Sequence, residues 1–299
     1  MSLARPVLPG CSYMITRRCT QRQFLMRPDE ETNNAFIYCL AEAAQRFGIL
    51  VLCVKVLSNH YHADVYDPHG NYPEFLEHFH KLFAKCQNSL RGRWENFWSS
   101  EQTSVVRLET PDDVLKSMIY SLTNPVKDHL VEKAIDWPGV SSLRSLLTGK
   151  PLKAQRPKHF FRKDGKMPKD VTLRFSRPKG FEQLTQKEFA ALVMSRVEEV
   201  ERKAREERGG GRVLGVKGVL RQSWQDSPKT AEPRRQLKPA VAAQNKWRRI
   251  EALLRNKSFQ LAYAKARDAF KLGLGNVLFP DGTYWMRRFA GVLCDVPFS

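Results

Sequence analysis

The chain has 299 residues, enough for one large domain or two smaller ones, and its 50 Lys and Arg against 31 Asp and Glu give a formal net charge of +19. Residues 1–149 hold 16 basic and 16 acidic side chains, which leaves 34 basic and 15 acidic for residues 150–299, so the second half predicts a polyanionic partner. Nucleic acid is favoured over an anionic membrane surface, and the longest apolar run, residues 47–57, is too short for a membrane span.

Hydrophobic periodicity predicts seven elements in the first half of the chain. In order they are a strand at 12–18, a helix at 30–47, a strand at 49–57, a strand at 60–66, a helix around 75–86, a strand at 104–108 and a helix at 111–124. This order is typical of the split βαβ pattern with one helix added. We therefore expect an α+β fold with a ferredoxin-like (RRM-like) antiparallel sheet and helices on one of its faces.

Beyond residue 150 the sequence becomes basic, contains several prolines and shows few strand patterns. Thr185 and Glu188 form a capping box before a helix that runs to about Arg208, and a second long helix is predicted at about 242–271. The expected organisation is an α+β domain at 1–150, a basic linker at 151–184 and a mainly helical basic region at 185–299.

The six cysteines are scattered without CxxC spacing, and the first ten residues lack the apolar stretch of a secretory signal. Both observations predict reduced thiols in a cytoplasmic protein, associated with the nucleoid if its partner is DNA.

A histidine pair lies on the strand predicted at 60–66. Because alternate strand residues share one face, His60 and His62 can converge on one ion, whereas Tyr61 turns to the other face. His78 and His80 have the same spacing on a predicted helix, where the two side chains diverge. The spacing alone is therefore a weak signal, and two ordinary histidines on a half-exposed strand would explain it as well.

The helix at 111–124 supports the pair, because Tyr120 and Asn124 lie one turn apart on a common face. An amide oxygen is a suitable third ligand beside two imidazoles. Taken singly, Tyr120 reads as a core aromatic and Asn124 before Pro125 as a helix end. Their occurrence together with the histidine strand favours a metal site next to a nucleophile.

Four stretches of this sequence resemble the HUH single-tyrosine transposases, in particular the REP-associated tyrosine transposases. They are YMITRR, RFGILVLCVKVLSNHYH, RWENFW and YSLTNPVKDHLVEKAIDWPG, and they span about residues 10–145. The resemblance implies a divalent metal, Mg²⁺ or Mn²⁺, on His60, His62 and Asn124, and Tyr120 as the nucleophile that forms a 5′-phosphotyrosine on single-stranded or hairpin DNA. The family has Met-Pro-Asn before the first histidine, where this chain has Leu57, Ser58 and Asn59.

Two further residues keep alternatives open at this site. Asp64 shares the histidine face and could replace Asn124 as a ligand, and Tyr61 is a second tyrosine that strand alternation turns away from the metal. The rival functions are a non-catalytic DNA- or RNA-binding descendant of a transposase, and a replication initiator or relaxase. The latter often uses two tyrosines one helical turn apart, and Tyr120 has no such companion.

Cationic side chains interleaved with aromatic ones predict contacts to single-stranded nucleic acid. We expect the protein to act as a monomer or a homodimer. The candidates are Arg17, Arg18, Arg91, Arg93, Trp94, Arg156, Lys158, Phe160, Phe161, Arg162, Arg248 and Arg249.

Overall fold

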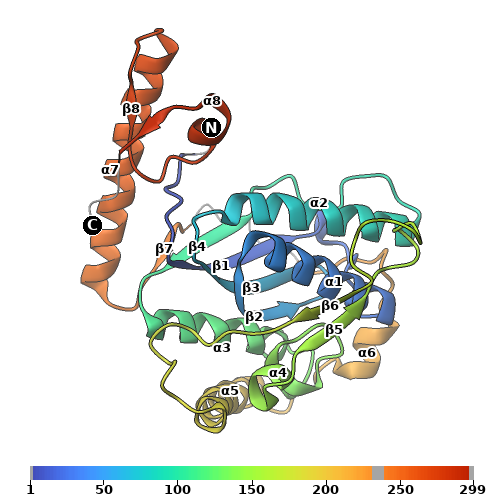
Figure 1. The fold of residues 1–299 in the computed structure, drawn as a ribbon. Helices are drawn as coiled ribbons and strands as arrows, with labels where there is room; N and C mark the ends of the chain where they lie inside the picture. Colours follow the sequence, from blue (N-terminus) through green and yellow to red (C-terminus); the bar gives the residue numbers. More distant parts are fainter. Residues whose placement is uncertain (1–2, 231–238, 296–299) are drawn as a thin grey trace.

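The computed structural model describes residues 3–230 and 239–295, and residues 231–238 and 296–299 of the expected C-terminal region lie outside it. A five-stranded sheet runs through the body in the order β2-β3-β1-β4-β7 (Figure 1). All neighbouring pairs are antiparallel except β4 and β7. The strands are β1 (Cys11–Arg18), β2 (Leu50–Val56), β3 (His60–Asp67), β4 (Ser104–Leu108) and β7 (Val241–Ala242). The α+β class expected from the sequence is confirmed.

Two long helices cover one face of the sheet. They are α1 (Glu30–Phe47) and α2 (Tyr72–Arg91), and they pack with Ile15, Tyr61 and Val65 in one buried cluster. The Asp29 side chain caps α1 by accepting from the Thr32 amide. Gly48 ends this helix with φ of 66°, the left-handed conformation that favours glycine. The chain can therefore turn directly from α1 into β2.

The opposite face carries α3 (Pro111–Lys127), α4 (Leu143–Thr148) and α5 (Gln186–Arg208). Their apolar side chains, among them Met118 and Val193, pack with Leu52 and Leu108 in a second buried cluster. Helices therefore cover both faces, and the expectation of helices on one face only is wrong. The amphipathic patterns could not specify the face, because period alone identifies the apolar side of a helix and not its partner.

Residues beyond 150 are built into the same body. The hairpin of β5 (Leu152–Gln155) and β6 (Asp170–Leu173) packs on α1, and α5 packs on α3 and α4. Ala154, Val171 and Leu173 belong to the buried cluster under α1. The expected linker at 151–184 is thus an ordered part of the core packing. Three short helices complete the body: η1 (Thr20–Arg22), η2 (Ala134–Asp136) and α6 (Gly215–Arg221).

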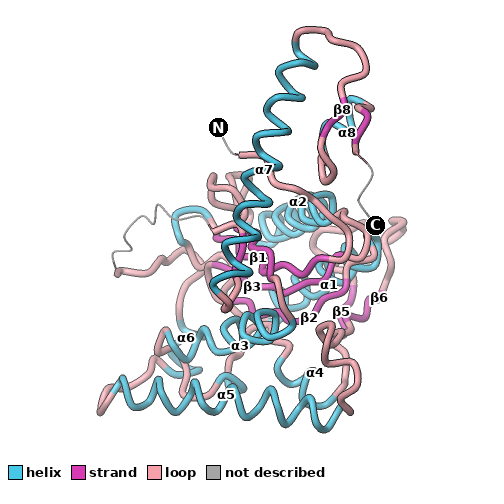
Figure 2. The backbone as a smooth tube through the Cα atoms, turned by 90° about the vertical axis from the view of Figure 1, so that its left-hand side faces the viewer, coloured by secondary structure: helices cyan, strands magenta, loops and turns pink. Residues whose placement is uncertain are grey.

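The last part of the chain, residues 245–295, forms a projection that we call the C-terminal arm. Helix α7 (Lys246–Lys271) extends beyond the body, and the chain returns through β8 (Leu278–Phe279), α8 (Trp285–Ala290) and β9 (Leu293–Cys294) (Figure 2). Strands β8 and β9 pair in parallel as a separate two-stranded sheet. Throughout the described ranges, no helix is both long and apolar enough to span a membrane.

Candidate active site

Strand β3 presents the histidine pair on the face covered by α3. The ring centroids of His60 and His62 lie 4.9 Å apart at a mutual angle of 87°. Tyr61 points the other way, into the cluster beneath α1 and α2, and is 1% exposed. The alternation expected of a strand therefore holds here, and the hydroxyl of Tyr61 is directed away from the histidines.

Hydrogen bonds fix the orientation of both imidazoles. Nδ1 of His60 lies 2.7 Å from the Asn59 side-chain oxygen, and Nδ1 of His62 lies 2.8 Å from the Thr16 hydroxyl. Because an amide oxygen only accepts, His60 donates from Nδ1, and its Nε2 keeps a free lone pair. Nε2 of His62 is buried and has no hydrogen-bond partner in the described protein. The two Nε2 atoms are therefore the ones available to a ligand.

Burial keeps both rings neutral at neutral pH. Desolvation, with a smaller effect from the positive charge of Arg18, lowers the pKa of His60 to about 4. Desolvation also lowers the pKa of His62 well below its ordinary value, with smaller effects from His60 and Arg18. Neutral imidazole is the form that binds a metal ion.

Helix α3 places Tyr120 beside His62 and carries Asn124 one turn further along. The ring centroid of Tyr120 lies 5.6 Å from that of His62, and the residue is 41% exposed, so it is not enclosed in the core. Asn124 is buried, and its Oδ1 is a second buried atom without a hydrogen-bond partner in the described chain. The sequence-based alternative that Tyr120 is a core aromatic is therefore wrong.

The helix continues through Pro125 to Lys127, three residues past the predicted end. Proline costs the helix one N–H bond to the preceding turn, but Val126 is buried in the cluster beneath α3, which holds the last turn in place. Asn124 consequently has helical geometry and shares a face with Tyr120.

Lys127, which the sequence did not single out, joins the site through this extra turn. Its Nζ lies 4.8 Å from the centroid of the Tyr120 ring. Partial burial lowers its pKa from the ordinary value. The available signal was its position seven residues after Tyr120, two turns along the same helix face.

Asp64 fastens α3 to β3. Its carboxylate is fully buried, and its two oxygens accept hydrogen bonds from the hydroxyls of Ser117 and Ser121. Burial raises the pKa of Asp64 to about 7, against the opposing effect of the two serine bonds. Because both oxygens already have donors, this geometry favours Asn124 over Asp64 as a third ligand. In the sequence, Ser117 and Ser121 could be recognised only by their spacing of four residues on the predicted helix.

The second histidine pair diverges as expected on a helix. His78 contacts the Glu42 carboxylate at 2.6 Å, whereas His80 contacts the Tyr61 hydroxyl at 2.5 Å and Arg17 at 2.6 Å. These partners lie on different elements, so the pair cannot share one ion.

The first candidate nucleic-acid segments divide between structural and exposed positions. Arg17 is bound to His80 and lies over the Trp98 ring at 5.2 Å. Arg18 is the cross-strand neighbour of His60 and so lies at the site.

In the segment at 91–98, Arg91 pairs with Asp29, and Arg93 donates to Gln23. Trp94 is 89% exposed, whereas Phe97 and Trp98 close the core.

The remaining candidates lie on the β5–β6 connection and on α7. Arg156 donates to the carbonyls of Lys163, Gly165 and Met167 and thereby holds its own loop together. Phe161 packs on Tyr38 at 5.3 Å, with Phe160 against it at 4.9 Å. Four cations are exposed: Lys158, Arg162, Arg248 and Arg249. These four are better placed than Phe160 and Phe161 to meet a ligand.

Comparisons with known proteins found two solved structures of interest. A REP-associated tyrosine transposase bound to a REP hairpin is 16% identical, with a TM-score of 0.42, over 60% of this chain and 97% of the other. A candidate transposase from Deinococcus radiodurans R1 is 15% identical, with a TM-score of 0.27, over 36% of this chain and 85% of the other. No protein-family model and no curated protein matches the chain.

Proposed function

We propose that the protein is a metal-dependent tyrosine nuclease and strand transferase of the HUH class that acts, like a transposase, on single-stranded or hairpin DNA. The observation that carries this proposal is the convergence of three groups from two elements. The histidine pair on β3 faces the accessible Tyr120 on α3, and two buried polar atoms of this site, His62 Nε2 and Asn124 Oδ1, have no partner in the described protein.

The residues present fit a divalent cation. Burying an unpartnered nitrogen lone pair and an amide oxygen is unfavourable, and an ion bound by both would remove the penalty. His60, His62 and Asn124 would hold the ion, with Mg²⁺ or Mn²⁺ suggested by the family resemblance. In the described residues, no three His, Cys, Asp or Glu side chains cluster as ligands, so an amide is the natural third donor. When bound, such an ion supplies polarisation of a phosphate oxygen and offsets negative charge.

The chemistry assigned to the chain's own residues is a transesterification. The Tyr120 oxygen bonds to phosphorus as the bond to the 3′ oxygen breaks, and the tyrosine proton ends on the released 3′-hydroxyl. The bond energy is kept in a 5′-phosphotyrosine, so a later strand can be joined without ATP. Lys127, over the Tyr120 ring, favours negative charge on the tyrosine and on the incoming phosphate. A second positive charge comes from Arg18 beside His60.

The fold is compatible with this proposal. The strand order β2-β3-β1-β4 and its antiparallel pairing support the ferredoxin-like part of the proposal. The histidines on the internal strand β3 then face α3, the helix that follows β4. Both elements pack on each other in regular secondary structure, which favours the precise positioning that a nucleophile requires.

The decisive experiment uses hairpin-bearing single-stranded DNA labelled at either end, with Mn²⁺ or Mg²⁺. We expect a denaturation-resistant adduct that carries the 3′ label, and a released fragment that carries the 5′ label and a free 3′-hydroxyl. Tyr120→Phe and His60→Ala should abolish the adduct. The matched controls Tyr66→Phe and His78→Ala remove the same chemical groups elsewhere and should retain it.

Adduct formation without a divalent ion, or an adduct that persists in Tyr120→Phe, would contradict the assigned roles. DNA binding without an adduct on any hairpin sequence would leave the alternative, a non-catalytic DNA- or RNA-binding protein derived from a transposase.

A further inference from the structure

Helix α8 in the C-terminal arm exposes two aromatic rings side by side. Trp285 is 43% exposed and Phe289 is 77% exposed, and the rings are stacked with centroids 5.4 Å apart and planes within 12°. A monomeric protein gains nothing from leaving two adjacent flat rings in water, so this pair marks a contact surface. We call Trp285, Phe289 and the neighbouring Arg287 the α8 platform.

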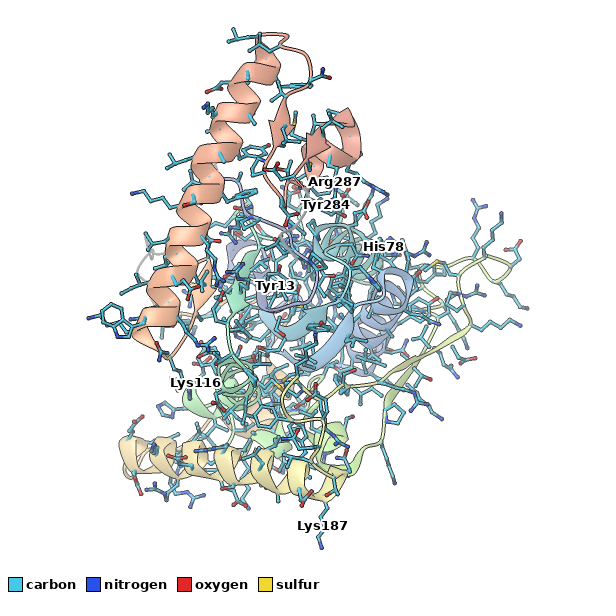
Figure 3. The ribbon with its side chains drawn as sticks, turned by 60° about the vertical axis from the view of Figure 1, so that its left-hand side comes forward. Tyr13, His78, Lys116, Lys187, Tyr284 and Arg287 are labelled. Carbon is cyan, nitrogen blue, oxygen red and sulfur yellow. The ribbon has the colours of Figure 1, made fainter. Side chains whose placement is uncertain are left out.

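The platform is fastened to the body. Arg288 on the same helix pairs with Glu74 of α2 at 2.7 Å, and the Val7 amide donates to the Gly282 carbonyl at 2.9 Å. Tyr284, which directly precedes α8, is buried in the cluster of α1 and α2. Figure 3 shows Tyr284 and Arg287 where the arm meets the body. The two exposed rings therefore have a fixed position before any ligand binds.

The charge of the arm identifies the chemistry of the partner. Residues 245–295 contain ten Lys and Arg and four Asp and Glu, a net charge of +6. Arg287 is exposed and makes no hydrogen bond or ion pair to any described residue. A second copy would bring another basic arm against this one, which the charge disfavours. A polyanion with flat apolar groups matches both the rings and the cations.

We propose that the α8 platform is a second contact for single-stranded DNA, on which an unpaired base stacks against Phe289 and Trp285 while Arg287 binds the adjoining phosphate. Base stacking on an aromatic side chain tolerates any sequence, because every base has a π face. A duplex keeps its bases inside, so the platform should not recognise one. This inference does not depend on cleavage at Tyr120.

The platform lies apart from the histidine site. Helix α8 is tied to α2, which covers one face of the sheet, whereas Tyr120 lies on α3 over the other face. Helix α7 connects the two sides, since the Gln244 amide just before it donates to Asp113 at the start of α3. A single DNA strand bound at both places would pass the edge of the sheet that β4 and β7 form (Figure 1).

The test measures binding of the full chain to a 30-nucleotide oligodeoxythymidine by fluorescence anisotropy at fixed salt. Phe289→Leu keeps an apolar side chain and removes the flat ring, and we expect it to raise Kd about 5- to 100-fold, the effect of losing one stacked base. Phe289→Trp should bind like the unchanged protein. Leu293→Ala, an exposed aliphatic change on the same arm, is the matched control and should have no effect.

Further measurements decide between outcomes. Binding to a 20-base-pair duplex should be the same in Phe289→Leu and the unchanged protein, and every binding measurement is made in EDTA, so that metal-dependent cleavage does not occur. This condition separates the platform from the proposed cleavage, because the platform can hold when no adduct forms. The inference is overturned if Phe289→Leu binds the oligonucleotide unchanged. It is also overturned if oligouridine binds over tenfold more tightly, or if sedimentation shows a dimer that Phe289→Leu and Leu293→Ala both dissociate.

Discussion

Thr16 and His62 lie directly opposite each other on β1 and β3, and the Thr16 hydroxyl lies 2.8 Å from His62 Nδ1. A ligand histidine is normally oriented through its second ring nitrogen, and loss of that partner typically lowers metal affinity 10- to 100-fold. We therefore expect Thr16→Val, which keeps the side-chain shape, to weaken Mn²⁺ binding by about that factor in calorimetric titrations. Thr148→Val removes an exposed hydroxyl far along the chain and should leave the affinity unchanged.

The bond from Asp64 to the two serines of α3 should set the position of Tyr120. Ser117→Ala or Ser121→Ala leaves one buried carboxylate oxygen without a donor, and we expect each to lower the free energy of unfolding by about 1–3 kcal/mol. The single-turnover rate of adduct formation should fall while the Kd for DNA stays constant. Thr123→Val, which loses a buried hydroxyl on the same helix, is the control. Equal rates in all three variants would reduce Asp64 to a purely structural role.

Lys127 should act on the reaction through its charge. We expect Lys127→Met to slow adduct formation about tenfold or more at pH 7, because the positive charge over the Tyr120 ring is lost. Lys127→Arg should restore most of the rate. The side chain is exposed, so urea unfolding should change little in either variant. A rate that is lost in both variants would indicate packing rather than charge as the cause.

Lys55 predicts how the stability depends on pH. Its ammonium is fully buried on β2 and donates to the Ala134 carbonyl and the Ser141 hydroxyl. Burial lowers its pKa from 10.5 to about 7. Between these values the unfolded chain binds the additional proton, so the free energy of unfolding rises with pH from about 7 to 10.5. Below pH 7 Lys55 is protonated in both the folded and the unfolded state, and its contribution to the free energy of unfolding is lost.

The measurement compares urea unfolding of the protein and of Lys55→Met across pH 6 to 10. Methionine cannot titrate, so the rise over this window should be smaller in the variant, by a few kcal/mol at about 1.4 kcal/mol per pKa unit. Parallel curves would show that Lys55 does not carry the dependence.

The site was predictable from the sequence to the extent that it depends on local periodicity. The alternation of β3 placed His60 and His62 together, and helical spacing placed Tyr120 beside Asn124. The hydrogen bonds from Ser117 and Ser121 to Asp64 could not be predicted from the sequence, because predicting them requires knowing which residues of α3 contact which residues of β3. The integration of residues 151–184 was missed for a related reason. A basic, proline-containing composition resembles a linker, yet three apolar side chains of its hairpin are enough to seat it on α1.

The arm shows the same limit at larger scale. The long helix of the arm was expected from the sequence. The exposure of Trp285 and Phe289 depends on the ion pair between Arg288 and Glu74, which lie more than 200 residues apart in the sequence. Sequence patterns describe which side of an element is apolar and leave open whether a partner covers it.

The two residues of β7 have a consequence for any shortened version of this protein. Val241 and Ala242 pair with β4, whose other side is already bonded to β1. A protein cut before residue 239 would leave β4 as an open edge strand, and unpaired strand edges recruit further copies and aggregate. A shortened protein that ends after Gln244 keeps that edge covered. It also keeps the hydrogen bond from the Gln244 amide to Asp113 at the start of α3, the helix that carries Tyr120. Solubility of the truncated form therefore depends on a few residues that carry no chemistry themselves.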